Sequence, residues 1–406
     1  MKYRELPPTA GLPPLWRDLL PGPSTLAQDL GNLLQLPEPL LTCSGTAALV
    51  IALNALAEQS TRHIVILPAY TCPLVLLAVI HCGLQARLCD LAPNHFDLDK
   101  NHLEQLLDND VLAVIPTHLG GRIADVAGIA TMAKALGIFV IEDAAQALGA
   151  YSNGKSVGQT GDIGFFSLAA GKGLSIFEGG LLWSHDTALR VLLQQSHNRL
   201  IQHNWRWSGL RLLQMLGYTA LYNPYGLYTA YGQPLRKSLQ QGNKITAVGD
   251  DFDRDIPLHT VGRWRQIMGH HALTRLPAFL IQTREQAKHR LSQLNNLPGL
   301  QVMQDTNNNA GVWPFFMVLM ASEAARDAVL QTLWTRGLGV SRLFIHALSD
   351  YDYLRDCFTP LTSGITSKNN TPHARDFAAR MFTITNSPWL SDIEFAEIIA
   401  AIRNTI

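Results

Sequence analysis

The sequence contains few cysteines, and their spacing suits neither a metal site nor a disulfide framework. Among 406 residues there are five, with no Cys-x-x-Cys pair. They are Cys43, Cys72, Cys82, Cys89 and Cys357. An odd number without such a pair indicates neither zinc binding nor a set of disulfides. This cysteine usage fits a reducing compartment, so we expect a cytoplasmic protein.

Net charge and uninterrupted apolar segments are also lacking. Lys and Arg together number 32, as do Asp and Glu, and there is no long basic run. Because phosphate contacts demand a positive surface, we do not expect nucleic-acid binding as the main role. The proline-rich residues 1–16 lack the apolar core of a signal peptide. Residues 64–84 are apolar, but Pro68 and Pro73 interrupt them, which favours a buried strand followed by a helix over a membrane span.

Hydrophobic residues, by contrast, are plentiful. They make up 47% of a chain that is long enough for two domains and a large core. Apolar runs alternate with helical stretches and lie near residues 64, 86, 111, 138 and 163. This alternation is typical of a mainly parallel sheet covered by helices on both faces. We therefore expect an α/β large domain over residues 1–259.

The remaining residues, 260–406, predict a smaller α+β domain. A long helical stretch from about Thr260 reaches a turn at Pro298. A strand-like segment, a helix-like segment and a last helix follow at residues 312–320, 321–339 and after 387. The polar residues 362–372 are expected to form a mobile loop.

Asp143 and Lys172 are the residues most suggestive of chemistry. Asp143 follows an apolar run whose carboxyl end would face the crevice where parallel sheets bind ligands. Pyridoxal phosphate (PLP) needs a lysine amine for its aldehyde and a carboxylate beside its pyridine nitrogen, so the pair suggests the two ends of a PLP site. Ser167, five residues before Lys172, would place a hydroxyl near the phosphate. Alternatively, Asp143 caps a helix beginning at Ala144, and Lys172 is a solvated loop lysine.

A phosphate site is suggested upstream, where small residues open an apolar helix from about Thr46. Helix N-termini bind phosphate through free backbone N–H groups and a favourable dipole. Gly45 would let the backbone approach closely. Gly45 and Thr46 are thus phosphate candidates, although the same residues with Ser44 also suit an ordinary N-cap.

Five motifs in order, SGTAAL, PAYT, THLGGRIAD, EDAAQALGA and FFSLAAGKGL with EGG, resemble those of the DegT/StrS family of PLP-dependent sugar aminotransferases. The resemblance runs from about Pro37 to Trp183 and from about Thr260 to the C-terminus. It implies the aspartate aminotransferase-like fold, fold type I of PLP-dependent enzymes, in which homodimers with composite active sites are common. A large domain with a mainly parallel sheet and a smaller C-terminal α+β domain agree with that fold.

The resemblance also implies roles for individual residues. Lys172 would bond to the cofactor and later move a proton between substrate and cofactor, and Asp143 would pair with the pyridinium nitrogen. Gln146, three residues on and on the same face of an expected helix, would lie near the phenolic oxygen. The implied phosphate ligands are Gly45, Thr46 and Ser167. His118, after the strand-like residues 111–115, is either a pocket residue or a satisfied histidine at a strand end.

Two positions depart from the family pattern. Where an aromatic residue commonly stacks on the cofactor ring, this chain has Cys72. Tyr70 either supplies the ring face instead or is simply packed. Arg263 occupies the position of an Asn that commonly reaches the neighbouring subunit's site, and Arg265 matches a family Arg there. Arg263 could bind an anion bidentately or lie on the surface.

A third departure is an apparent insertion at about residues 199–259. Its Trp, Tyr and Leu content is too high for a solvated loop, and Tyr222, Tyr225, Tyr228 and Tyr231 form one stripe if the segment is helical. We expect this stripe to be core or subunit interface, with substrate binding and membrane-surface contact as alternatives.

The implied reaction is transfer of an amino group from glutamate or glutamine to a keto-sugar, most simply a nucleotide-linked deoxysugar, in polysaccharide or antibiotic sugar biosynthesis. Two other functions stay open. The first is cofactor-driven dehydration of a sugar, but family members of that kind generally replace the lysine, so Lys172 argues against it. The second is a non-catalytic regulatory or scaffold protein, an idea motivated by Cys72, Arg263 and the insertion.

Overall fold

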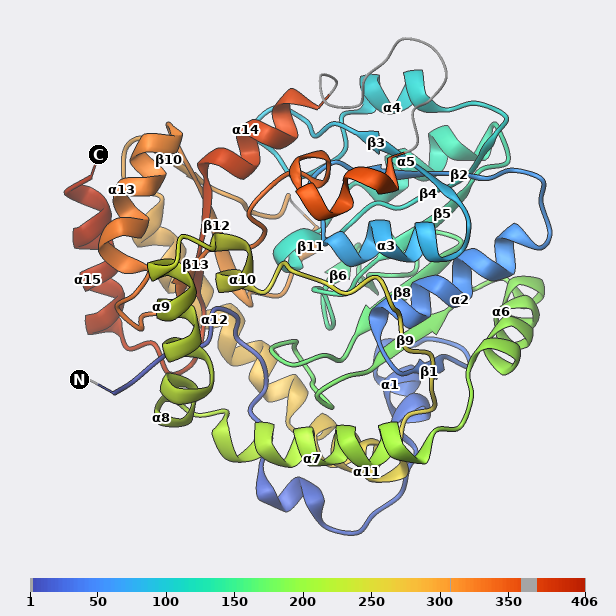
Figure 1. Ribbon diagram of the computed structural model, residues 1–406, viewed down its shortest axis with the longest axis horizontal. Helices are drawn as coiled ribbons and strands as arrows, with labels where there is room; N and C mark the ends of the chain where they lie inside the picture. Colours follow the sequence, from blue (N-terminus) through green and yellow to red (C-terminus); the bar gives the residue numbers. More distant parts are fainter. Residues whose placement is uncertain (1–2, 307, 359–370, 406) are drawn as a thin grey trace.

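The computed structural model describes residues 3–306, 308–358 and 371–405. Its largest element is a seven-stranded sheet (Figure 1), with the strand order β1-β9-β8-β5-β4-β2-β3. In that order the strands are Leu40–Thr42, Gly180–Trp183, Ile163–Ser167, Phe139–Asp143, Val111–Val114, Ile64–Pro68 and Gln85–Cys89. The five strands from β8 to β3 are parallel, and β9 is antiparallel to both of its neighbours. The predicted mainly parallel sheet is confirmed, with β2, β3, β4, β5 and β8 at the five apolar runs.

Helices cover the large sheet on both faces, as its two-sided burial requires. The helices of this part are α1 (Leu26–Leu34), α2 (Gly45–Ala57), α3 (Pro73–His81), α4 (Lys100–Leu106), α5 (Val126–Lys134) and α6 (Thr187–Leu200). Successive strand residues point to opposite faces. Phe165 therefore packs with α2 and α3 in one core, whereas Phe166 packs with α1 in the other. Residues 64–84 form β2 and α3, a buried strand followed by a helix, as predicted.

The second sheet is antiparallel and has the order β10-β12-β14-β13. These strands are Leu300–Val302, Phe315–Met320, Met381–Thr385 and Val340–Ser341. Helices α13 (Glu323–Leu333), α14 (Pro372–Arg380) and α15 (Asp392–Arg403) accompany this sheet. Its core also contains Leu235 and Ala247 from the insertion, so packing crosses the predicted boundary between residues 259 and 260.

The predicted long helical stretch before Pro298 is two helices, α11 (Arg263–Leu273) and α12 (Leu276–Leu294). The remaining short strands, β6 (Tyr151–Ser152), β7 (Lys155–Ser156) and β11 (Asn309–Ala310), form a small sheet of their own. The short helical turns are η1 (Trp16–Leu19), η2 (Leu119–Gly121), η4 (Leu348–Asp350) and η5 (Asp352–Cys357). Of the predicted mobile loop, residues 362–370 lie outside the described part of the chain.

The insertion is helical but not one continuous helix. It contains α7 (Trp205–Leu221), α8 (Pro224–Leu227), the π-helix η3 (Tyr228–Gly232), α9 (Gln233–Gln240) and α10 (Lys244–Val248). Tyr222 lies at the break after α7 and is 6% exposed, whereas Tyr225 is 66% exposed. The break separates Tyr222 from the other three tyrosines, which lie in helical residues 224–232, so the four do not form a single stripe. In the part of the chain that the structure describes, no helix combines the length and the apolar character needed to cross a membrane.

Arg122 connects the chain after β4 to the chain before β12. Its guanidinium is buried, forms an ion pair with Asp305, donates to the carbonyl oxygen of Val312, and lies 3.3 Å from the ring centroid of Trp313. Burial lowers the pKa of this guanidinium to about 10. Because β12 begins just after Trp313, this cation fixes the turn η2, after β4, against the second sheet.

Replacement of this buried arginine is expected to destabilise the fold strongly. Arg122→Ala would leave the Asp305 carboxylate without its cation, which costs about 3–5 kcal/mol for a buried pair. The matched control is Arg199→Ala, which removes an exposed ion pair with Glu58 and should cost under about 1 kcal/mol. The free energy of unfolding from urea denaturation measures both. Equal effects of the two substitutions would contradict the role assigned to Arg122.

Candidate active site

A cavity of about 530 Å³ lies at the carboxyl ends of the parallel strands. Segments that follow β2, β4, β5 and β8 all border it, because parallel strands bring their ends to one edge of the sheet. The predicted site residues that line it are Gly45, Thr46, Cys72, Asp143, Gln146, Ser167 and Lys172. Those that do not line it are Tyr70, His118, Arg263 and Arg265.

Lys172 reaches the cavity from the turn after β8. Gly171 precedes it with a φ of +77°, a conformation that favours glycine and that a side chain would crowd against Thr9. Burial lowers the pKa of the Lys172 amine, and Cys72 and Asp143 partly oppose this effect. A lysine with a lowered pKa is more often neutral, which is the nucleophilic form of an amine. The solvated-loop interpretation of Lys172 is therefore not supported by its surroundings.

Asp143 ends β5 and is 4% exposed. Its Oδ1 accepts a hydrogen bond from the backbone N–H of Ala145 at 3.0 Å, and its Oδ2 accepts one from the Thr117 hydroxyl at 3.4 Å. Burial raises the pKa of this carboxyl group, while the Ala145 N–H and Lys172 act in the opposite direction. A cation placed beside Asp143 would lower that pKa and stabilise the carboxylate.

The segment after Asp143 differs from the expected helix. Residues 144–150 form turns, so Asp143 caps no helix at Ala144, and Gln146 does not share a helical face with it. Gly149, with a φ of +87°, and the hydrogen bond from Ala147 N–H to Ala144 C=O are features of this turn. Gln146 nevertheless borders the cavity, where its Oε1 accepts the Gly120 N–H at 2.7 Å.

The amino end of α2 and the end of β8 form a cradle of small residues. Ser44 caps α2 by accepting the Ala47 N–H at 2.9 Å, which leaves Gly45 and Thr46 at the cavity. A Cβ on Gly45 would lie 3.1 Å from the Cβ of Ser167. This close approach brings a helix N-terminus beside a hydroxyl, an arrangement that suits a phosphate group. The N-cap and the cradle coexist rather than exclude each other.

Cys72 and Tyr70 have different positions. Cys72 borders the cavity, and burial raises the pKa of its thiol to about 12, so it is protonated at neutral pH. Tyr70 is 1% exposed and lies outside the lining. Its hydroxyl donates to the carbonyl oxygen of Phe344 at 3.1 Å and accepts the Phe344 N–H at 3.2 Å. The packed interpretation of Tyr70 is the one that its contacts support.

His118 is buried away from the cavity. Its Nδ1 accepts the Ala124 N–H at 3.0 Å, so its Nε2 carries the proton and donates to Glu142 Oε1 at 2.8 Å. Burial alone would raise the pKa of Glu142, but the His118 hydrogen bond and backbone N–H groups hold it below its ordinary value. These contacts make His118 a satisfied histidine after β4, the second of its two interpretations.

Arg263 and Arg265, both at the start of α11, differ in their exposure to solvent. Arg263 is exposed, whereas Arg265 is 1% exposed and donates to the carbonyl oxygen of Glu178. Glu178 itself borders the cavity. Arg265 therefore supports the cavity wall from behind, and its Nη2 has no hydrogen-bond partner among the described residues.

Several further residues line the cavity, and of these only Tyr231 was singled out by the sequence analysis. Tyr231, Val248, Gly249, Asp250, Phe252, Asp255, Ile256 and Pro257 come from the insertion, and Arg342 and Phe344 follow β13. Burial raises the pKa of Asp250 to about 6, although Tyr351 and the Ile345 N–H donate to its carboxylate. The insertion thus supplies part of the cavity wall in addition to core residues.

The residues present fit a PLP molecule. The half-buried Lys172 and the buried Asp143 carboxylate border the same cavity, and the cradle at Gly45 and Ser167 offers small residues and a helix N-terminus for a phosphate.

Comparison with known proteins gives sequence relatives and a shared fold. The chain is 33% identical to GDP-perosamine synthase of Caulobacter vibrioides over 164 residues, which are 40% of this chain and 44% of the relative. It is 37% identical to UDP-N-acetyl-3-dehydro-alpha-D-glucosamine 3-aminotransferase of Acidithiobacillus ferrooxidans over 156 residues, 38% of this chain and 42% of that one. The matched regions thus span less than half the length of these curated relatives.

A solved structure matches almost the whole chain. It is the PLP form of a Streptococcus pneumoniae protein described as a sugar aminotransferase, with a TM-score of 0.72 and 19% identity over 99% of this chain and 98% of that one. The fold is therefore the predicted fold type I. Residues 21–216 and 266–403 match the sequence model of the DegT/DnrJ/EryC1/StrS aminotransferase family. The unmatched residues 217–265 include most of the expected insertion, although the match covers its first residues, 199–216. This chain belongs to the DegT/DnrJ/EryC1/StrS aminotransferase family.

Proposed function

We propose that this protein is a PLP-dependent aminotransferase that moves an amino group from glutamate or glutamine to the keto group of a nucleotide-linked sugar. The observation that carries the proposal is the meeting of Lys172, Asp143 and the cradle at Gly45 in one cavity of a chain from this family. When bound, PLP supplies an electron sink that lets an amino group leave one substrate and join another.

Lys172 has two tasks in this proposal. Its amine would hold the cofactor, and the same amine, when free, would carry a proton to and from the substrate carbon. The lowered pKa of Lys172 favours both tasks, because an amine must be neutral to attack or to accept a proton.

Asp143 and the cradle orient the cofactor. The Asp143 carboxylate, oriented by its hydrogen bonds from Ala145 and Thr117, would pair with the cationic ring nitrogen. Gly45, Thr46 and Ser167 would hold the phosphate through backbone N–H groups and hydroxyls. Gln146 borders the same space and stays a candidate for the phenolic oxygen.

The sugar and its nucleotide are the finer part of the proposal. The two curated relatives named above carry GDP and UDP in their names, which supports a nucleotide-linked acceptor. Tyr231 and Asp250 of the insertion line the cavity, so we take them as candidates for contact with that acceptor. A cytoplasmic homodimer, in which a second copy completes the site, is part of the same proposal.

The direct experiment incubates the purified protein with PLP, glutamate or glutamine, and a panel of nucleotide-linked keto-sugars. Mass spectrometry then detects the aminated sugar. An aminated product with any member supports the proposal. A bound cofactor without product from any donor and acceptor would favour a non-catalytic role instead.

Lys172→Ala is expected to lower turnover by about 10²- to 10⁴-fold, because it removes the group that transfers the proton. The same substitution should abolish the visible absorbance band of lysine-bound PLP. Lys155→Ala is the matched control, since Lys155 is an exposed lysine on β7 away from the cavity. Normal turnover in the Lys172 variant would contradict the proposed mechanism.

Gly45→Ala is expected to weaken PLP binding, because the new methyl group would lie 3.1 Å from Ser167 Cβ and fill the phosphate cradle. Equilibrium dialysis or a fluorescence titration with PLP measures the dissociation constant. The control is Gly209→Ala in α7, where an added Cβ meets nothing within 4 Å. If both variants bound PLP as tightly as the unmodified protein does, the cradle would not be the phosphate site.

A further inference from the structure

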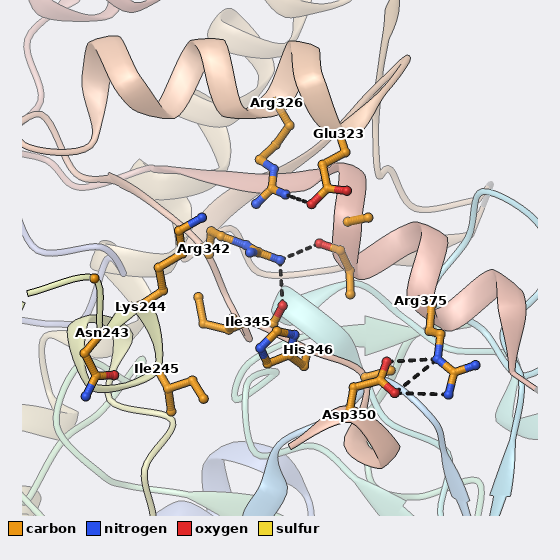
Figure 2. A pocket seen from close by; sticks show the side chains of 14 residues that line it. Asn243, Lys244, Ile245, Glu323, Arg326, Arg342, Ile345, His346, Asp350 and Arg375 are labelled. Carbon is orange, nitrogen blue, oxygen red and sulfur yellow. Dashed lines mark hydrogen bonds and ion pairs between the residues drawn. The ribbon is translucent and has the colours of Figure 1, made fainter. Parts of the chain in front are cut away.

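A second pocket, of about 340 Å³, lies beside the second sheet (Figure 2). Its walls come from the start of α10, from α13 and α14, and from the chain that follows β13. Lys172 and Asp143 do not line it. Arg342 is the residue that borders both this pocket and the active-site cavity.

The lining of this pocket carries more positive than negative charge. Its cationic side chains are Lys244, Arg326, Arg342 and Arg375, and its carboxylates are Glu323 and Asp350. Arg326 donates to Glu323 at 3.0 Å, and the Arg375 Nε donates to Asp350 at 2.9 Å. Both carboxylates are thereby paired, so Lys244 and Arg342 have no carboxylate partner within the described ranges of the chain.

Arg342 is buried although no carboxylate of the described chain forms an ion pair with it. It is 7% exposed, and its Nη2 donates to the carbonyl oxygens of Ile345 and Ala378 at 2.7 and 2.5 Å. Its Nε is buried and has no hydrogen-bond partner among the described residues. Burial and the nearby Arg326 both hold the pKa of the Arg342 guanidinium below its ordinary value.

Arg326 adds a second under-satisfied guanidinium. It is 1% exposed and pairs with Asp327 as well as Glu323, yet its Nη1 is buried without a hydrogen-bond partner in the described chain. In Figure 2 the side chains of Lys244, Arg326 and Arg342 extend toward the same part of the pocket. Buried cations placed together are unfavourable unless an anion compensates them.

We propose that this pocket binds a small molecule through a phosphate group held by Arg342, Arg326 and Lys244. Guanidinium groups match phosphate oxygens with paired hydrogen bonds, and a lysine adds a mobile positive charge. The phosphate belongs either to the diphosphate of the amino acceptor, reached past Arg342, or to a separate phosphorylated ligand. The second source is independent of the proposed reaction, whereas the first rests on it.

The test is isothermal titration of the protein, saturated with PLP, with pyrophosphate as the probe. Saturating PLP keeps the cradle at Gly45 occupied, so the probe reports on other sites. We expect saturable binding that Lys244→Ala weakens about tenfold, the equivalent of one charge-assisted hydrogen bond. Arg342→Lys, which keeps the positive charge but loses the paired N–H donors of the guanidinium, should weaken pyrophosphate binding as well. The matched control is Lys237→Ala on α9, an exposed lysine outside the pocket, which should leave binding unchanged.

Absence of saturable binding, or binding that neither pocket variant changes, would overturn the proposal. Lys244 is exposed, so its variant stays informative if the buried Arg342 variant does not fold.

A second titration distinguishes the two sources of the phosphate. If UDP or GDP displaces pyrophosphate, and Lys244→Ala lowers the affinity for the nucleotide as well, the phosphate is that of the acceptor. If pyrophosphate and the nucleotides bind together, a separate ligand occupies the pocket. Neither titration requires turnover, so failure of this binding proposal can be distinguished from failure of the proposed reaction.

Discussion

The electrostatic interaction between the Lys172 amine and the Asp143 carboxylate in a buried cavity is the constraint on which the rest of the site depends. Two charges removed from water are unfavourable unless they compensate each other or a ligand does so. Here burial shifts both pKa values toward the neutral forms, and each group opposes the shift of the other. A cofactor that offers an aldehyde to the amine and a cationic nitrogen to the carboxylate resolves this conflict.

The sheet explains why these two residues meet. β5 and β8 are parallel neighbours, with Asp143 paired to Phe165, so Asp143 lies beside the end of β8 and the turn that carries Lys172. A second pairing places the cradle: Gly180 of β9 pairs with Ser167 of β8 and with Thr42 of β1, and the chain that follows Thr42 brings Gly45 against Ser167. The site thus lies at the common end of several buried strands, whose pairing positions the residues that follow them.

Sequence patterns predicted the features that depend on local chemistry. The apolar runs, the lysine and carboxylate after strands, and the small residues opening α2 are all readable from neighbouring residues. Tertiary packing decided the rest. His118 could not be distinguished from a pocket residue until Glu142 was seen to bind it, and Ala-rich residues 144–150 form turns instead of the expected helix. The place of Arg342 and Asp250 in the cavity wall could not be predicted, because it depends on the packing of the insertion beside β13.

Reduction of the PLP-loaded protein with borohydride, followed by peptide mass spectrometry, would test the central claim most directly. Reduction makes the bond between a lysine and the cofactor permanent, so the modified peptide identifies the residue. The account predicts a single modified peptide that contains Lys172. Modification of a different lysine, or none at all, would contradict the assignment of this cavity as the cofactor site.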